Sequence, residues 1–210
     1  MNQETLHEII GADIVETYNK PPSTRVLLDP ACGGHNQISL YSRLPKSRGS
    51  KFCCPDIVIC RDDAVRVVIE IEDNGKSGKI GPAKIGGKLL PAALAKHLLH
   101  PEVGMIAIRD YFALVQIANT ATLQPRTRRY EQYDNLAEDI RRLVPLGSVG
   151  TYYLIPTLLH EFRSENSKAR DDLRSAIDLA LEREPTAEGR TDRHLSRIGG
   201  WPRLRRSKRT

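Results

Sequence analysis

The sequence has no apolar run long enough to cross a membrane. Its longest uninterrupted apolar stretch, residues 89–95, contains Pro91 and falls well short of the roughly 20 residues that a transmembrane helix needs. The N-terminal residues carry several acids and no basic segment ahead of an apolar block, so they do not predict an export signal. We therefore expect no membrane span and a cytoplasmic location.

Cysteines are few and lack the spacing of a zinc site. No C-x-x-C pair occurs, and all four cysteines lie in the first third of the chain: Cys32, Cys53, Cys54 and Cys60. Without an export signal they are expected to be reduced thiols. A zinc site that joins His35 to Cys32 is an alternative. Cys60 ends an apolar run and fits better as a small buried hydrophobe.

The charge of the chain is unevenly distributed. With 210 residues, 40% of them hydrophobic and 28% charged, the chain suits one globular domain. Residues 190–210 hold eight of the 32 Lys and Arg residues but one of the 26 Asp and Glu residues, which gives them a net charge of +7 against −1 for residues 1–189. This pattern predicts a domain over 1–189 and a basic tail over 190–210 that suits a polyanion. A solvated, frayed terminus is the alternative.

Hydrophobic periodicity predicts an α/β domain with a mixed sheet. The N-terminal helix is expected over residues 4–18, and β-branched residues predict a hairpin of two strands around the turn at 61–64. A loop is expected over 43–51, and a central strand, covered on both faces, over 103–109. The other expected elements are strands at 25–28, 38–41 and 151–155 and helices at 83–99 (broken near Leu90 by Pro91), 130–144 and 162–183.

Three acidic residues are placed to meet at the end of this hairpin. Side chains alternate along a strand, so Glu70 and Glu72 share a face, and Asp56 begins the neighbouring strand. Clustered carboxylates are costly unless a cation or a lysine neutralises them, and such hard oxygen ligands suit Mg²⁺. The alternative is an ordinary solvent-facing edge strand, with Asp56 serving only as a turn residue.

Pro55-Asp56 and Glu70-Ile71-Glu72 resemble the motif of the PD-(D/E)xK nuclease superfamily, in which Pro-Asp on one strand precedes Asp/Glu-x-Lys on the next, followed by a helix and another strand. Glu72 departs from the usual lysine and is similar to the Glu-x-Glu variant of type II restriction endonucleases. The resemblance covers roughly residues 38–109. It implies a restriction-endonuclease-like mixed β-sheet flanked by helices.

The resemblance also implies a set of roles. The implied ligands of Mg²⁺ are Asp56, Glu70 and the carbonyl oxygen of Ile71. Glu72 would orient the attacking water. The missing lysine would be Lys84 or Lys88, one helical turn apart on the following helix. A further acid from the N-terminal helix, Glu8 or Glu16, often joins such sites.

The implied activity is Mg²⁺-dependent hydrolysis of DNA, with a homodimer as the expected form because cutting both strands needs two sites. Basic residues suited to phosphate contacts are Lys79, Arg126, Arg128, Arg129, Arg205 and Arg206. Two alternatives stay open. One is a catalytically inactive nuclease-like module that binds nucleic acid, and the other is a structural protein whose basic tail contacts ribosome or lipid.

Overall fold

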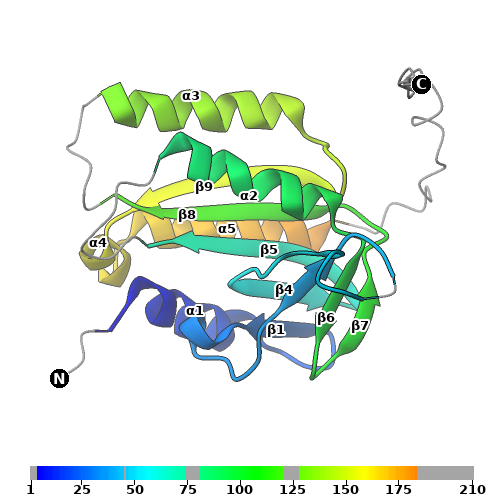
Figure 1. Cartoon of the computed structure of the whole chain (residues 1–210). Helices are drawn as coiled ribbons and strands as arrows, with labels where there is room; N and C mark the ends of the chain where they lie inside the picture. The colour runs from blue at the N-terminus through cyan, green and yellow to red at the C-terminus, as the bar shows by residue number, and fades with distance from the viewer. Residues whose placement is uncertain (1–3, 45, 74–80, 121–127, 184–210) are drawn as a thin grey trace, which may run out of the picture.

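The protein is built around a mixed sheet of five strands. In this computed structural model, residues 4–44, 46–73, 81–120 and 128–183 are described. The strand order is β1-β4-β5-β8-β9, in which β1, β4 and β5 pair antiparallel and β5, β8 and β9 pair parallel (Figure 1). The strands are β1 (Thr24–Leu28), β4 (Ile57–Arg61), β5 (Ala64–Glu72), β8 (Phe112–Asn119) and β9 (Val149–Thr157).

A second, smaller sheet packs against part of the main one. Its four strands are antiparallel in the order β3-β2-β6-β7. They are β2 (Ser39–Tyr41), β3 (Lys51–Cys53), β6 (His97–His100) and β7 (Gly104–Ala107). Leu40, Leu98 and Ile106 from this sheet share a buried cluster with Val58 and Val68 of the main sheet. The small sheet thus covers part of one face of the main sheet, the face on which Val58 and Val68 lie.

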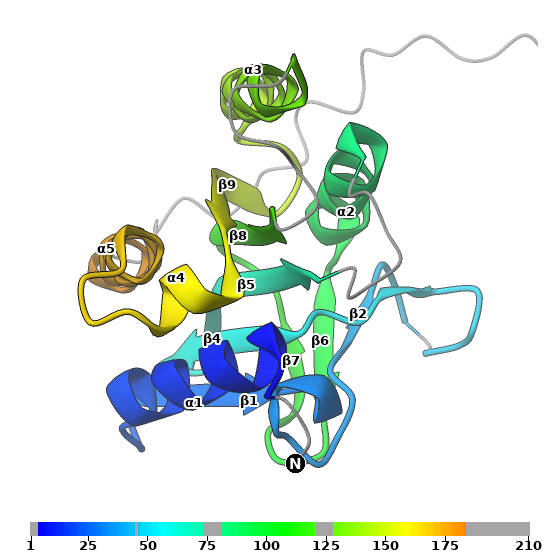
Figure 2. The ribbon, with the colours of Figure 1, turned by 90° about the vertical axis from the view of Figure 1, so that its left-hand side faces the viewer.

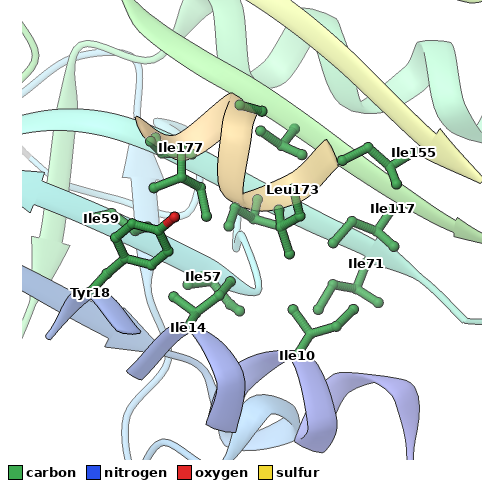
Figure 3. Packing of buried hydrophobic residues seen from close by; sticks show 14 of the residues in the cluster. Ile10, Ile14, Tyr18, Ile57, Ile59, Ile71, Ile117, Ile155, Leu173 and Ile177 are labelled. Carbon is green, nitrogen blue, oxygen red and sulfur yellow. The ribbon is translucent and has the colours of Figure 1, made fainter. Parts of the chain in front are cut away.

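One face of the main sheet is covered by α1 (Leu6–Tyr18) and α5 (Lys168–Glu182), with the short α4 (Leu159–Arg163) and a 3₁₀ turn, η1 (Pro30–Cys32), beside them. Helix α1 begins at a capping box between Thr5 and Glu8. Figure 3 shows the packing between the helices and the sheet, which consists mostly of isoleucine and leucine. Its members include Ile10, Ile14, Leu173 and Ile177 from the helices and Ile57, Ile59, Ile71, Ile117 and Ile155 from the strands.

The opposite face is covered by α2 (Pro82–Leu94) and α3 (Arg128–Leu143). Figure 2 shows α2 and α5 on opposite sides of the sheet, with α3 beside β9. Helix α2 buries Ile85, Leu89 and Ala92. Within the described residues, no helix is long and apolar enough to span a membrane.

The predicted α/β class is confirmed: the protein has a mixed sheet flanked by helices. The β4–β5 hairpin is confirmed as well. Its two-residue loop, Asp62 and Asp63, has positive φ at both positions, as a type I′ turn requires. The N-terminal helix and the strands now seen as β1, β2 and β9 also lie where the sequence indicates, with ends shifted by a few residues.

Helix α2 ends at Leu94, so the prediction of a helix to residue 99 is wrong. The predicted break near Leu90 is also wrong, because α2 continues through Pro91 as one helix. After Leu94 the chain joins the small sheet, where the Lys96 amide donates a hydrogen bond to the carbonyl oxygen of Tyr41 (2.8 Å). The long helix predicted over 162–183 is two helices, α4 and α5, with a break between them at residues 164–167. Strand β3 begins where the sequence predicts only a loop.

The prediction of a central strand at residues 103–109 is also wrong. Strand β7 lies at the edge of the small sheet and is mostly exposed. The next strand along the chain, β8, is an interior strand of the main sheet: it lies between β5 and β9 and buries seven of its eight residues. Two apolar runs follow each other closely here, and it is the second that forms a buried strand of the main sheet. Gly104, with φ +70°, marks the turn into β7.

Candidate active site

Two buried carboxylates at the end of β5 face helix α2. Glu70 has no exposed surface and Glu72 is 3% exposed. Lys88 Nζ lies 2.7 Å from Glu70 Oε2, and Lys84 Nζ lies 2.6 Å from Glu72 Oε2. The structure therefore brings both predicted lysines to the two predicted acids.

The two ion pairs form because strand and helix advance by matching distances. Two strand residues cover about 6.6 Å, and four helical residues rise by about 6 Å. Helix α2 runs in the opposite sense to β5 here, so that Glu70 meets Lys88 and Glu72 meets Lys84. Alternation along β5 sends Ile69 and Ile71, between and beside the acids, into the isoleucine cluster on the other face.

Asp56 lies next to Glu70, one residue before β4 begins. Ile57 pairs with Ile69 in the antiparallel ladder, which places Asp56 opposite Glu70. Asp56 Oδ2 accepts a hydrogen bond of 2.6 Å from the Ile71 amide. The N–H and C=O of a strand residue point to the same side, so the Ile71 carbonyl also faces Asp56.

The side chain of α1 that reaches this place is His7, whose Nε2 lies 4.0 Å from Asp56 Oδ1. Neither acid predicted from this helix is shown at the site: Glu8 closes the capping box and Glu16 is exposed. His7 was missed because its role depends on how α1 docks, and the helical pattern itself carries no sign of it.

Burial governs the electrostatics of the site. It raises the pKa of Glu70 to about 7; Lys88 opposes this shift, and the negative charges of Asp56 and Glu72 add to it. Burial also raises the pKa of Asp56, opposed by the hydrogen bond from Ile71 and by His7. Burial alone would lower the pKa of Lys88, but Glu70 reverses this and raises it. The acids are thus held in a place that disfavours their charge unless cations are close.

One oxygen of Glu70 is unsatisfied. Oε1 is buried and has no hydrogen-bond partner within the described part of the chain, while Oε2 is taken by Lys88. A buried carboxylate oxygen with an open lone pair is a donor that a hard divalent cation prefers. Together with Asp56 and the Ile71 carbonyl it forms an oxygen donor set that fits Mg²⁺, which uses one or two carboxylates and keeps several waters.

The three acids lie near one another, since, beside burial, Asp56 and Glu72 both raise the pKa of Glu70, but they do not form a three-carboxylate metal site. Among the described residues, no group of three or more His, Cys, Asp or Glu side chains is arranged to hold a metal ion. Glu72 is paired with Lys84, whereas Asp56 lies opposite Glu70 at the end of the β4–β5 ladder, so Asp56 and Glu70 are the adjacent pair of acids. Any ion here would be held by two carboxylates, not three.

The cysteines form no metal site within the described residues and are all free. Cys60 is buried in the core, as expected. Burial is the largest cause that raises the pKa of Cys53, on β3, to about 12. The second cause is the nearby negative charge of Glu70. The thiol is therefore protonated at neutral pH and is a poor nucleophile.

Most of the predicted phosphate-binding residues cannot be placed. Lys79, Arg126, Arg205 and Arg206 lie outside the described residues, as does the basic tail. Arg128 and Arg129 form the first turn of α3, and only their backbone is described.

Comparison of the chain with models of known protein families, with curated proteins and with solved structures gives no match. The function must therefore be argued from the chemistry of the site.

Proposed function

We propose that this protein is a Mg²⁺-dependent endonuclease that hydrolyses phosphodiester bonds in DNA on a restriction-endonuclease-like fold. The observation that carries the proposal is the state of Glu70: a fully buried carboxylate, beside a second carboxylate, with one oxygen on a lysine and the other unsatisfied. Such a group is costly to fold and is explained by binding a cation.

The order of elements supports the same reading. Asp56 precedes β4, Glu70 and Glu72 end β5, α2 carries the lysines, and β8 then pairs parallel to β5. This order resembles the strand, strand, helix and strand order of the PD-(D/E)xK motif, with β8 in place of the strand expected at 103–109 and with β6 and β7 inserted before it. The parallel crossover brings the ends of β5 and β8 to one edge of the sheet.

The residues divide into ligands and cations. Asp56, Glu70 and the Ile71 carbonyl would hold Mg²⁺, which when bound supplies Lewis-acid stabilisation of the phosphate and activation of a water. Lys88, which is partly exposed and paired with Glu70, would offer a point charge for the negative charge that develops on phosphorus. Lys84 holds Glu72, which would orient the attacking water.

A nuclease-like module without catalysis is the second candidate. It is favoured by one observation: each glutamate already has a lysine partner, so the ion pairs themselves neutralise the acids. This candidate predicts salt-dependent binding of DNA with no cleavage. DNA as the partner, a homodimer and a role for the basic tail in binding DNA belong to the main proposal.

The test is incubation of supercoiled plasmid with the full chain in Mg²⁺ or in EDTA. We expect nicked or linear DNA in Mg²⁺ alone, with loss of cleavage in Glu70→Gln and in Asp56→Asn. Glu165→Gln, at an exposed glutamate on the surface, is the matched control and should cut normally. DNA binding without cleavage by the unmodified protein in Mg²⁺ and Mn²⁺ would instead select the inactive module.

A further inference from the structure

A buried glutamine stands beside Glu70 on the neighbouring strand. Gln116 on β8 is in register with Glu70 on the parallel β5, so the two side chains lie on the same face of the sheet. Gln116 is fully buried. It is the one polar residue in the apolar run from Phe112 to Ala118.

The orientation of its amide is fixed from the other side. Tyr152 on β9, also buried, donates its hydroxyl hydrogen to Gln116 Oε1 at 2.7 Å. Because the amide oxygen faces Tyr152, the amide nitrogen faces away from it. That nitrogen, Nε2, is buried and has no hydrogen-bond partner among the described residues.

Two adjacent side chains thus each present an unsatisfied buried atom of opposite character. Gln116 Nε2 is a donor without an acceptor, and Glu70 Oε1 is an acceptor without a donor. An unpaired buried polar group is costly, so one hydrogen bond between the two would lower the cost of burying each of them. The two residues are paired in register on neighbouring strands, so their side chains lie side by side on one face of the sheet.

We infer that Gln116 is a positioning residue for Glu70: its Nε2–H donates to Glu70 Oε1, and Tyr152 holds the amide in the orientation that makes this possible. The inference rests on the proposed function only in what the hydrogen bond is for. A carboxylate oxygen has two lone pairs, so Oε1 can accept from Gln116 and still face a metal ion. Such outer partners orient the carboxylates that ligate metals.

The first experiment needs no metal. A double-mutant cycle of Gln116→Leu and Glu70→Leu, followed by urea unfolding in EDTA, measures whether the two side chains interact. We expect a non-additive shift in the midpoint. Additive midpoints would overturn the inference, whatever the protein does to DNA.

The second experiment measures Mn²⁺ binding by calorimetry and the Mg²⁺ concentration for half-maximal cleavage. We expect Gln116→Leu to raise both the Kd for Mn²⁺ and the Mg²⁺ concentration for half-maximal cleavage by roughly 10- to 100-fold. Tyr152→Phe should raise both quantities by less. Tyr153→Phe is the matched control, because Tyr153 packs at the isoleucine cluster on the other face. Unchanged metal dependence in both Gln116→Leu and Tyr152→Phe would overturn the positioning role.

The two proposals fail in different ways. If the unmodified protein neither binds Mn²⁺ nor cleaves DNA, the proposed function fails, while a non-additive cycle still supports the hydrogen bond. If the unmodified protein is active and the cycle is additive, the inference alone fails. If Gln116→Leu does not fold, Tyr152→Phe takes its place in the cycle.

Discussion

Lys88 Nζ lies 2.7 Å from Oε2 of a glutamate, Glu70, that has no exposed surface at all. The lysine itself is only partly covered, with 34% of its side chain exposed. The pair therefore connects a fully buried carboxylate on β5 to a partly exposed lysine on α2. One oxygen of Glu70 is paired with Lys88, and the other has no hydrogen-bond partner among the described residues.

Removing the lysine should cost stability in a pH-dependent way. The pKa of Glu70 is raised in the folded state, so its ionisation costs folding free energy that accumulates between about pH 4.5 and about pH 7 and is constant above that. Without Lys88 that cost grows. We expect Lys88→Met to lose roughly 1–3 kcal/mol at pH 8, discounted from the range for fully buried pairs because the lysine is partly exposed, and less at pH 5.

Urea unfolding at both pH values measures this effect. Lys168→Met, which removes a lysine that is almost fully exposed, is the control and should change stability by no more than about 0.5 kcal/mol. Equal stability of Lys88→Met and the unmodified protein at pH 8 would show that Glu70 does not depend on this partner.

Metal binding should depend on pH through the same carboxyl. A divalent ion needs the ionised form of Glu70, whose pKa is about 7. Below that pH the affinity for Mn²⁺ should fall about tenfold for each pH unit, and above it the affinity should level off. The raised pKa of Asp56 acts in the same direction. Calorimetry between pH 5.5 and 8.5 measures the profile, and a flat profile would exclude Glu70 as a ligand.

Two glycine substitutions should change stability in opposite directions. A Cβ at Gly11 on α1 would collide with the backbone carbonyl of Cys32, whereas a Cβ at Gly86 in α2 would meet nothing within 4 Å. We expect Gly11→Ala to destabilise the protein by roughly 1–3 kcal/mol and Gly86→Ala to stabilise it by roughly 0.5–1 kcal/mol. Thermal unfolding of the two variants side by side tests the packing of both helices. A loss of stability in Gly86→Ala would contradict the open environment of that position.

The isoleucine cluster should tolerate truncation poorly. Leu173 on α5 is fully buried against the sheet, and Leu179 on the same helix is 53% exposed. We expect Leu173→Ala to lose roughly 2–5 kcal/mol and Leu179→Ala about 0.5 kcal/mol or less. Urea unfolding compares the two, and similar losses would mean that α5 does not pack as described.

The sequence predicted those features that depend on neighbours along the chain. The β4–β5 hairpin follows from two β-branched runs and a short polar turn, and the shared face of Glu70 and Glu72 follows from alternation. Lys84 and Lys88 share a helical face because they are one turn apart. Local spacing therefore placed the two acids on one face of the strand and the two lysines on one face of the helix. The resemblance to the PD-(D/E)xK motif assigned the lysines to the same site as the acids.

The features that the sequence did not predict depend on pairing between distant segments. His7 lies near Asp56 only because α1 packs against the sheet. Gln116 lies beside Glu70 only because β8 pairs with β5. The mistaken central strand has the same origin: an apolar run at 103–108 resembles a core strand until β7 is seen at the edge of the small sheet. Neither periodicity nor composition encodes which strand lies next to which.

Acids and core residues alternate along β5, and this has a consequence for how the strand finds its place during folding. A slip of one position would drive Glu70 and Glu72 among the isoleucines and turn Ile69 and Ile71 towards the lysines of α2. Both halves of that exchange are unfavourable. The charges proposed for chemistry thus also disfavour a misaligned β5. A variant that removes Glu70, Glu72, Lys84 and Lys88 together would lose this control of the strand register along with any activity.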